Sequence, residues 1–309
     1  MSSISVTASQ TAPEDCTAEA PLVSVIVPTY NRAVSLVDTL DALMVQDYPA
    51  ERLEIVVVDN SSTDNTEQVV LTAAKRSLVP VHYFRKENRG PAAARNYGIA
   101  RCQGTVLAFT DSDCTVPTTW VQSAVRLLEP GVGLVTGPIR GVVHPRRRPG
   151  FFQHQIPDQL KEHPTYPSAN VFYPRGLVEQ VGGLDERFGA FAWGPPVGGE
   201  DTYLAWQIKR AGYRSAWAEG AVVYHEATGL TALEWFGDTL RLQIVPRLVA
   251  LMPEVRRGLF WRYFVGPEHP IAYLALVGGA ATAATRRTRF LVLTFPWLWL
   301  ASQALRGDL

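Results

Sequence analysis

The sequence is poor in cysteine and has no excess of either charge over its 309 residues. Its three cysteines, Cys16, Cys102 and Cys114, form no C-x-x-C pair, which argues against a disulfide framework or a structural zinc site and favours a reducing compartment. The 29 basic residues equal the 29 acidic ones, so no net charge attracts the chain to nucleic acid. With 47% hydrophobic and 19% charged residues, the composition excludes a disordered chain and indicates one large or two modest globular domains.

The neutral total conceals a difference between the two parts of the chain. Residues 228–309 contain nine arginines and five acidic residues, a net charge of +4, which leaves −4 for residues 1–227. This positive charge suits contact with an anionic membrane surface. Residues 1–20 lack a basic start followed by an apolar run, so we expect a disordered tail and not a secretory signal.

Two apolar segments, residues 271–284 and 290–305, flank the basic stretch TRRTR at 285–289. Each is shorter than the ~20 residues that cross a bilayer upright. A spanning hairpin would also carry TRRTR to the side of the membrane opposite residues 21–227, against the positive-inside tendency if those residues are cytosolic. We therefore expect interfacial or re-entrant helices, with Trp297 and Trp299 near the headgroups. A spanning hairpin and a buried amphipathic cap on a soluble domain are the alternatives.

From residue 22, short apolar runs alternate with segments of helical periodicity. The pattern predicts strands over residues 23–28, 54–59, 81–84 and 105–110, and helices over about 34–46, 64–77 and 91–101. Continuous β-branched strands separated by helices predict a mostly parallel central sheet with helices on both faces. Ligands of such sheets bind outside the carboxyl ends of the strands, so the polar residues at those ends are the candidates for a site.

Three of these strand ends carry informative residues. The first ends in PTYNR (28–32) with no G-x-G-x-x-G, which weighs against a dinucleotide-binding unit. Asp59 ends the second, where it either forms a turn or accepts hydrogen bonds from the base or ribose of a ligand. Asp111 and Asp113 follow the fourth strand, and their i, i+2 spacing in a turn allows both carboxylates to reach one divalent cation.

Two later segments add ionisable groups. Glu200 and Asp201 precede the helical stretch YLAWQIKRAG. They either complement the helix dipole or present a general base at the edge of the ligand site expected beside the carboxyl ends of the strands. His225 follows the apolar run AVVY. Its imidazole is either structural or a partner of a metal ion or phosphate.

Together, seven segments resemble glycosyltransferase family 2, the inverting nucleotide-sugar transferases with a GT-A fold. They are VSVIVPTYNR (23–32), IVVVDNSSTDNT (55–66), ENRGPAAARNYGI (87–99), DSD (111–113), VGGLDERF (181–188), GGEDTYLAWQIKRAGY (199–213 with Gly198) and VVYHE (222–226). The resemblance covers about residues 22–227. It implies an α/β chain with a GT-A catalytic domain over 21–227, after the tail of 1–20 and before a helical, membrane-associated extension over 228–309.

The resemblance also implies the residues that hold the donor. Pro28, Tyr30 and Asp59 match positions that bind the nucleoside, Asp59 at the base. Asn88 and Arg95 match positions that line the nucleotide site, where a guanidinium suits a diphosphate.

The same resemblance implies the metal ligands and the catalytic base. Asp111 and Asp113 match the metal-binding DxD motif, with Asp113 as the more direct ligand of Mg²⁺ or Mn²⁺ and Asp111 also facing the nucleotide sugar. His225 resembles a histidine that completes the metal and diphosphate site in some members. Asp201 matches the usual catalytic base, and Glu200 is its neighbour.

Several residues concern the acceptor or depart from the family pattern. Cys114 stands where many members carry another Asp, and we expect it to be a small packing residue. Asp185 and Glu186 match a segment near the acceptor side of the cleft. The basic run Arg146, Arg147 and Arg148 either binds a phosphate-bearing acceptor or lies in a solvated loop. No Q-x-x-R-W sequence follows residue 201, which weighs against a processive polysaccharide synthase.

The expected activity is transfer of one sugar from a UDP or dTDP sugar to a hydroxyl of a lipid-linked or cell-envelope glycan. Asp201 would take the proton from that hydroxyl as it attacks the anomeric carbon, so the configuration inverts. The expected location is the cytoplasmic face of the cell membrane. The alternatives are a sugar nucleotidyltransferase on a related scaffold and an inactive membrane-associated scaffold.

Overall fold

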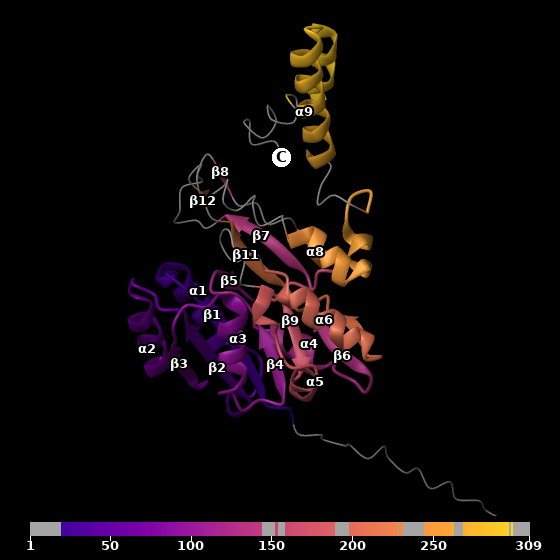
Figure 1. Ribbon diagram of the computed structural model, residues 1–309. Coiled ribbons are helices and arrows are strands. Elements are labelled where there is room, and N and C mark those ends of the chain that lie inside the picture. The colour runs from indigo at the N-terminus through magenta and orange to yellow at the C-terminus, as the bar shows by residue number, and fades with distance from the viewer. Residues whose placement is uncertain are drawn as a thin grey trace, which may run out of the picture.

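The computed structural model describes residues 20–143, 152–153, 158–188, 198–227, 229–230, 244–262, 268–296 and 298. Its centre is a seven-stranded sheet in the order β10-β6-β9-β4-β1-β2-β3 (Figure 1). The strands of this sheet are β1 (Val23–Thr29), β2 (Leu53–Asp59), β3 (Val81–Arg85), β4 (Val106–Phe109), β6 (Val132–Thr136), β9 (Val171–Pro174) and β10 (Arg214–Trp217). Strands β1 to β4 pair in parallel, as do β6 and β10, whereas β9 runs antiparallel to both of its neighbours. The predicted mostly parallel sheet is confirmed.

Helices cover both faces of this sheet. They are α1 (Ala33–Met44), α2 (Thr66–Arg76), α3 (Pro91–Ile99), α4 (Trp120–Val125), α5 (Arg175–Gln180) and α6 (Glu200–Arg210). Val25 and Val27 of β1 share one buried cluster with α1, α2 and α4, whereas Ile26 between them shares another with α3, α5 and α6. Successive side chains of a strand point to opposite faces, so a strand buried on both faces must be apolar throughout. This is why β1 and β2 are continuous apolar runs.

The predicted strands and helices of the first half agree with the structure to within about two residues. Helix α2 begins at Thr66 and not at residue 64. Asp64 accounts for the difference, because its Oδ1 accepts hydrogen bonds from the backbone N–H of Thr66 at 3.1 Å and from the Thr66 hydroxyl at 2.5 Å. A carboxylate that caps in this way lies outside the helix that it stabilises.

A second, three-stranded sheet stands beside the carboxyl ends of the central strands. Its strands are β5 (Cys114–Thr115), β11 (Val223–Ala227) and β7 (Ile139–Val143), with β11 in the middle. Antiparallel pairing of β5 and β11 places His225 directly opposite Cys114. This pairing brings the histidine to the DxD turn across 110 residues of chain, as the family resemblance implied, although no local pattern predicted the pairing with Cys114.

A fully buried amide joins the two sheets. Asn170, just before β9, accepts a hydrogen bond on Oδ1 from Trp120 Nε1 at 2.9 Å. Its Nδ2 donates to the carbonyl oxygens of Pro138 at 3.0 Å and Ala221 at 2.7 Å. Pro138 and Ala221 precede β7 and β11, so this one side chain holds the starts of both strands against the central sheet.

Part of the C-terminal region packs against the α/β core. Helix α8 (Ile244–Leu251) and the short helix η4 (Pro253–Gly258) place Leu248, Met252 and Val255 in a buried cluster with Phe188. Arg210, at the end of α6, forms an ion pair with Glu254 at 2.8 Å. The domain boundary predicted at residue 227 stays a prediction, but these contacts join the described residues 244–258 to α6.

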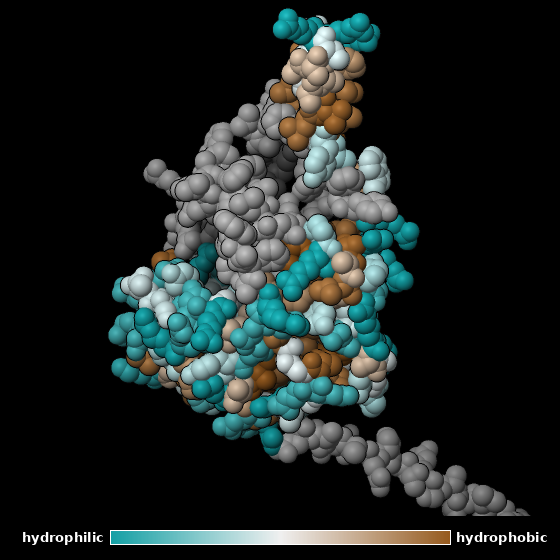
Figure 2. All heavy atoms as spheres, in the orientation of Figure 1, coloured by the Kyte–Doolittle hydropathy of each residue, from teal (hydrophilic) through white to brown (hydrophobic). Residues whose placement is uncertain are grey.

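The remaining C-terminal elements project from the rest of the molecule (Figure 1). Helix α9 (Glu268–Thr285) packs against η5 (Thr288–Thr294), and Figure 2 shows hydrophobic side chains along this pair with hydrophilic ones at its far end. Exposed apolar side chains on these two elements include Tyr273, Leu276, Val277, Val292 and Phe295. This exposure disagrees with the alternative in which the segments form a buried cap on a soluble domain. No helix in the described part of the chain is both long and apolar enough to span a bilayer.

The described residues of the apolar segment 290–305 are largely helical, with the 3-10 helix η5 at its beginning and α-helical residues at 295, 296 and 298. Trp297 and Trp299 lie outside the described residues. The other short elements are η1 (Ala50–Arg52), β8 (Phe152–Gln153), η2 (Glu186–Phe188) and β12 (Gly229–Leu230).

Candidate active site

The loops that follow β1 and β2 interlock at the carboxyl end of the sheet. The backbone N–H of Asn31 donates to Ser62 Oγ at 2.9 Å, and the N–H of Thr63 donates to Asn31 Oδ1 at 2.7 Å. Of the two residues that the resemblance assigned to the nucleoside here, Tyr30 is 49% exposed at the rim and Pro28 is buried in β1. Tyr30 is therefore available to a ligand, whereas Pro28 shapes the strand end.

Asp59 is fully buried and forms the turn considered from the sequence, while its contact with a ligand stays a prediction. Its Oδ1 accepts the backbone N–H of Ser62 at 2.7 Å, which closes a turn, and its Oδ2 accepts the hydroxyl of Tyr83 at 2.7 Å. Arg85 Nη1 lies 3.9 Å from the same Oδ2. Burial, together with Asp59, raises the pKa of Tyr83 well above its usual value, so the phenol stays a donor. The sequence singled out neither Tyr83 nor Arg85.

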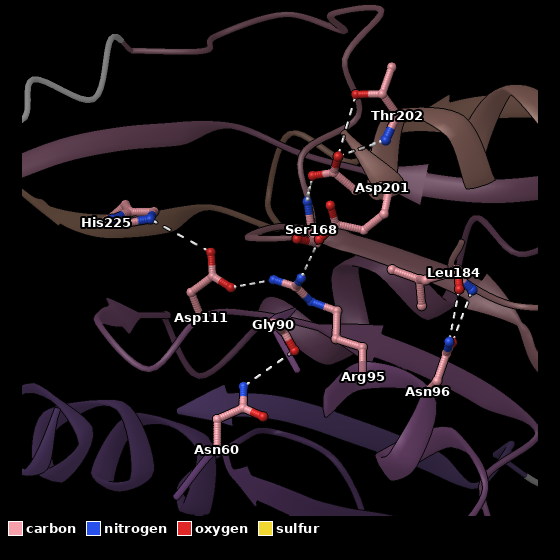
Figure 3. A network of polar contacts seen from close by, with 11 residues as sticks. Asn60, Gly90, Arg95, Asn96, Asp111, Ser168, Leu184, Asp201, Thr202 and His225 are labelled. Atoms are coloured by element: carbon pink, nitrogen blue, oxygen red, sulfur yellow. Dashed lines mark hydrogen bonds and ion pairs between the residues drawn. The ribbon is translucent and has the colours of Figure 1, made fainter. Parts of the chain in front are cut away.

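Two buried polar atoms near Asp59 have no hydrogen-bond partner in the described part of the chain. They are Thr29 Oγ1 at the end of β1 and Asn60 Oδ1 just after β2. Asn60 Nδ2 approaches the carbonyl of Gly90 at 3.4 Å (Figure 3). Buried polar groups are normally paired, so these two atoms carry hydrogen-bond capacity that the described residues leave unused. Asn88 itself is exposed and accepts the N–H of Gly90 at 3.1 Å.

The predicted metal ligands do come together. Donor atoms of Asp111, Asp113, Cys114 and His225 all lie within 4.8 Å of one another. His225 Nε2 is 3.7 Å from Asp111 Oδ2 and 3.8 Å from Asp113 Oδ1. Two carboxylates and an imidazole fit Mg²⁺ or Mn²⁺, which take oxygen ligands and, for Mn²⁺, nitrogen. Cys114 was expected only to pack, and its presence in this cluster was missed.

Mutual attraction controls protonation among these groups. Burial raises the pKa of Asp111, but interactions with His225 and Arg95 outweigh it and lower that pKa to about 2. Burial lowers the pKa of His225, yet the two carboxylates outweigh burial and raise it above its usual value. Arg32 Nη1 adds a further positive charge 3.5 Å from Asp113 Oδ2. Arg32, Arg95 and His225 therefore place positive charge next to the two carboxylates, as a bound metal ion would.

Arg95 connects the metal ligands to helix α6. It is 4% exposed, and its Nη2 donates to Asp111 Oδ1 at 2.7 Å while its Nη1 donates to Glu200 Oε1 at 3.1 Å (Figure 3). A guanidinium this deeply buried needs carboxylate partners to offset its lost hydration. The contacts differ from the expected one with a diphosphate, because both Nη atoms are directed to protein carboxylates.

Glu200 and Asp201 occupy the first turn of α6 but differ in access. Gly199 precedes them with φ of +98°, and a Cβ there would lie 2.9 Å from Leu248 Cδ2, so only glycine fits this approach to α8. Glu200 is 3% exposed, and burial, followed by the charge of Asp201, raises its pKa to about 7. Asp201 is partly exposed, and burial also raises its pKa.

The backbone positions the Asp201 carboxylate. Its Oδ2 accepts the N–H of Ser168 at 3.0 Å, and its Oδ1 accepts the N–H of Thr202 at 2.7 Å (Figure 3). The Thr202 hydroxyl lies a further 3.4 Å from Oδ1. Of the two neighbours, Asp201 is the more exposed.

The acceptor-side residues are only partly described. Asp185 binds Arg187, with Nη2 to Oδ2 at 2.7 Å, and Glu186 is exposed. Asn96 of α3 holds this loop by donating to the carbonyl of Leu184 at 2.8 Å and to Glu186 Oε1 at 3.0 Å. Arg146, Arg147 and Arg148 lie outside the described residues, so their function stays a prediction.

Comparison with known sequences agrees with this geometry. Residues 24–182 match the family described as Glycosyl transferase family 2. Glycosyltransferase AglE of Haloferax volcanii is 29% identical over 235 residues, which are 74% of this chain and 72% of that relative. Other curated relatives are longer, and the chain covers 42% of the length of two of them.

Solved structures show the same fold. The mannosyltransferase PcManGT from Pyrobaculum calidifontis, in complex with GDP-Man and Mn²⁺, superimposes with a TM-score of 0.60 at 23% identity over 94% of this chain and 87% of its own. Staphylococcus aureus TarS with UDP-GlcNAc gives a TM-score of 0.54 at 19% identity over 87% of this chain and 83% of its own. At such identities the likeness establishes the fold, which is GT-A.

Proposed function

The chain belongs to glycosyl transferase family 2, and on this premise we propose that it moves a sugar from a UDP or dTDP sugar to a hydroxyl of a lipid-linked or cell-envelope glycan. It is a transferase with a nucleotide-sugar donor. The observation that carries the finer proposal is the convergence of Asp111, Asp113 and His225 with the accessible carboxylate of Asp201. Arg95 holds these two groups side by side through Asp111 and Glu200.

In this proposal, Asp111, Asp113 and His225 would hold Mg²⁺ or Mn²⁺, which would supply positive charge to offset that of the diphosphate leaving group. The nucleoside lies against Tyr30 and Asp59, where Thr29 Oγ1 and Asn60 Oδ1 offer hydrogen-bond capacity that the protein leaves unused. The ring N–H of uracil or thymine can donate to a carboxylate, which is compatible with UDP or dTDP.

Asp201 acts as the general base. Its raised pKa makes it a better proton acceptor than an ordinary aspartate, and its two backbone hydrogen bonds hold it in one orientation. It takes the proton of the acceptor hydroxyl as the oxygen bonds to the anomeric carbon from the face opposite the leaving diphosphate. Configuration therefore inverts, and the reaction needs no sugar bound covalently to the enzyme.

Donor binding tests this function directly. With Mn²⁺ or Mg²⁺, a UDP or dTDP sugar at about 100 times its Kd is expected to stabilise the fold by about 2.7 kcal/mol, read as a rise in melting temperature. EDTA and the Asp113→Asn variant should each abolish most of that rise. GDP sugars serve as the matched comparison. Stabilisation by GDP sugars alone would show that the proposed nucleobase of the donor is wrong. No stabilisation by any nucleotide sugar would contradict the proposed donor site.

We also propose that α9 and η5 contact the cytoplasmic face of the cell membrane. Exposed apolar side chains along both elements, with Arg286, Arg287 and Arg289 where they join, support this proposal. Basic residues near an anionic surface contribute about 1 kcal/mol each, so changing all three arginines to Gln should weaken binding to anionic vesicles by roughly two orders of magnitude. Co-sedimentation with vesicles that contain anionic lipid, and with neutral vesicles of phosphatidylcholine alone, measures this binding. Equal recovery of parent and variant with both vesicles would contradict it.

A further inference from the structure

The candidate metal cluster contains the sulfur of Cys114, which is not a ligand that Mg²⁺ prefers. Donor atoms of Asp111, Asp113, Cys114 and His225 lie within 4.8 Å of one another, so some point is no more than about 2.9 Å from all four. Zinc sites have metal–sulfur distances of ~2.3 Å and metal–nitrogen or metal–oxygen distances of ~2.0–2.2 Å. Side-chain shifts of less than about 1 Å would therefore give all four atoms bonding distance to one ion.

The backbone holds Cys114 in this place. It is 1% exposed, its N–H donates to the carbonyl of Asp111 at 3.2 Å, and its strand β5 pairs with β11 so that it faces His225. The sulfur thus lies within 4.8 Å of a ring nitrogen of His225. Cys102 is also buried, but its Sγ lies by the carbonyl of Ile99, at the end of α3, and shares no cluster with metal donors in the described residues.

We propose that a thiophilic divalent cation, Zn²⁺ or Cd²⁺, takes Asp111, Asp113, Cys114 and His225 together as a complete tetrahedral shell and so blocks the active site. This inference rests on the proposed function, because the blocked position is the one assigned to the donor diphosphate. Binding releases the thiol proton to solvent, together with any proton on His225, and forms one metal–sulfur bond without oxidation or reduction.

The reason is the different ligand preference of the two kinds of cation. Mg²⁺ prefers six oxygen ligands and keeps several waters, so it leaves positions that a diphosphate can take. Zn²⁺ accepts thiolate and imidazole readily, and a site with four protein ligands is closed, as in structural zinc sites. Mn²⁺ binds such donors more weakly than Zn²⁺ does. One cluster therefore supports donor binding with one cation and prevents it with another.

Cadmium absorbance tests the sulfur ligand. A protein carrying Cys16→Ser and Cys102→Ser has Cys114 as its single cysteine, so a ligand-to-metal charge-transfer band on adding Cd²⁺ can come only from that thiolate. We expect one band that saturates at one Cd²⁺ per chain. Its absence in the folded single-cysteine protein would overturn the proposal, and this readout does not depend on any change at Cys114.

Affinity and competition complete the test. Competition with a chromophoric chelator measures the affinity for each metal ion. Cys114→Ser should weaken Zn²⁺ binding at least about tenfold and change the Mn²⁺ affinity far less. Cys102→Ser is the matched control and should leave both affinities unchanged. Unchanged Zn²⁺ affinity would overturn the proposal.

Zn²⁺-saturated protein should also lose the rise in melting temperature that UDP produces with Mn²⁺. Equal stabilisation by UDP with both ions would overturn the blocking. Failure of both UDP and dTDP to bind with Mn²⁺, while the cadmium band is present, would instead refute the proposed function and leave the four-ligand site in place.

Discussion

Replacing Asp201 by Asn is expected to lower turnover by about 10²- to 10⁴-fold, because the amide keeps the size of the carboxylate but cannot take a proton. The carboxylate is partly exposed, whereas its neighbour Glu200 is buried against Arg95, so no second carboxylate on this turn can substitute for it. Release of nucleoside diphosphate with the preferred donor measures the effect. The loss should appear in kcat, because donor binding depends on other residues.

Two controls separate chemistry from folding in this experiment. Asp41→Asn makes the same chemical change on the surface of α1, where the side chain is 46% exposed, and should leave turnover unaltered. The melting-temperature rise on adding UDP and Mn²⁺ should persist in Asp201→Asn. Near-normal turnover of the variant would show that another group removes the proton.

Replacing Arg95 by Met is expected to destabilise the protein by about 3–5 kcal/mol, the range for removing one partner of a buried ion pair. Methionine fills much of the same space, but Glu200 would remain buried without its cation and Asp111 would lose its contact at 2.7 Å. Urea unfolding measures the change. The surface pair of Arg214 with Glu129 provides the comparison, since Arg214→Met should cost less than about 1 kcal/mol.

The pH dependence of this deficit tests its electrostatic origin. With Arg95 in place, burial and the charge of Asp201 already raise the pKa of Glu200 to about 7. A raised carboxyl pKa means that stability from this group is present at low pH and is lost as pH rises through the folded-state value. Removing the cation raises the pKa further, so the deficit of Arg95→Met should be smaller at pH 5 than at pH 8. A deficit independent of pH would indicate lost packing instead.

Local pattern was sufficient for the core of the fold and for several candidate residues. Strands β1 and β2 could be predicted because burial on both faces leaves no polar position in them, and this shows as an unbroken apolar run. Asp59, Asp111 and Asp113 stood out because carboxylates at the ends of such strands are seldom needed for packing. The positions of Tyr83 and Arg32 gave no comparable signal, since each acts only through a partner from a distant loop or strand.

The sequence by itself determined the alternation of strands and helices, the acidic groups at the strand ends and membership of the family, because each depends on short segments read in order. Only the tertiary structure showed the contacts and the burial of those groups. Pairing of β5 with β11 sets His225 opposite Cys114 beside the DxD turn, and burial of Glu200 against Arg95 leaves Asp201 as the more exposed of the two carboxylates. Both outcomes depend on contacts between residues about 100 positions apart, and no local periodicity encodes contacts at that separation.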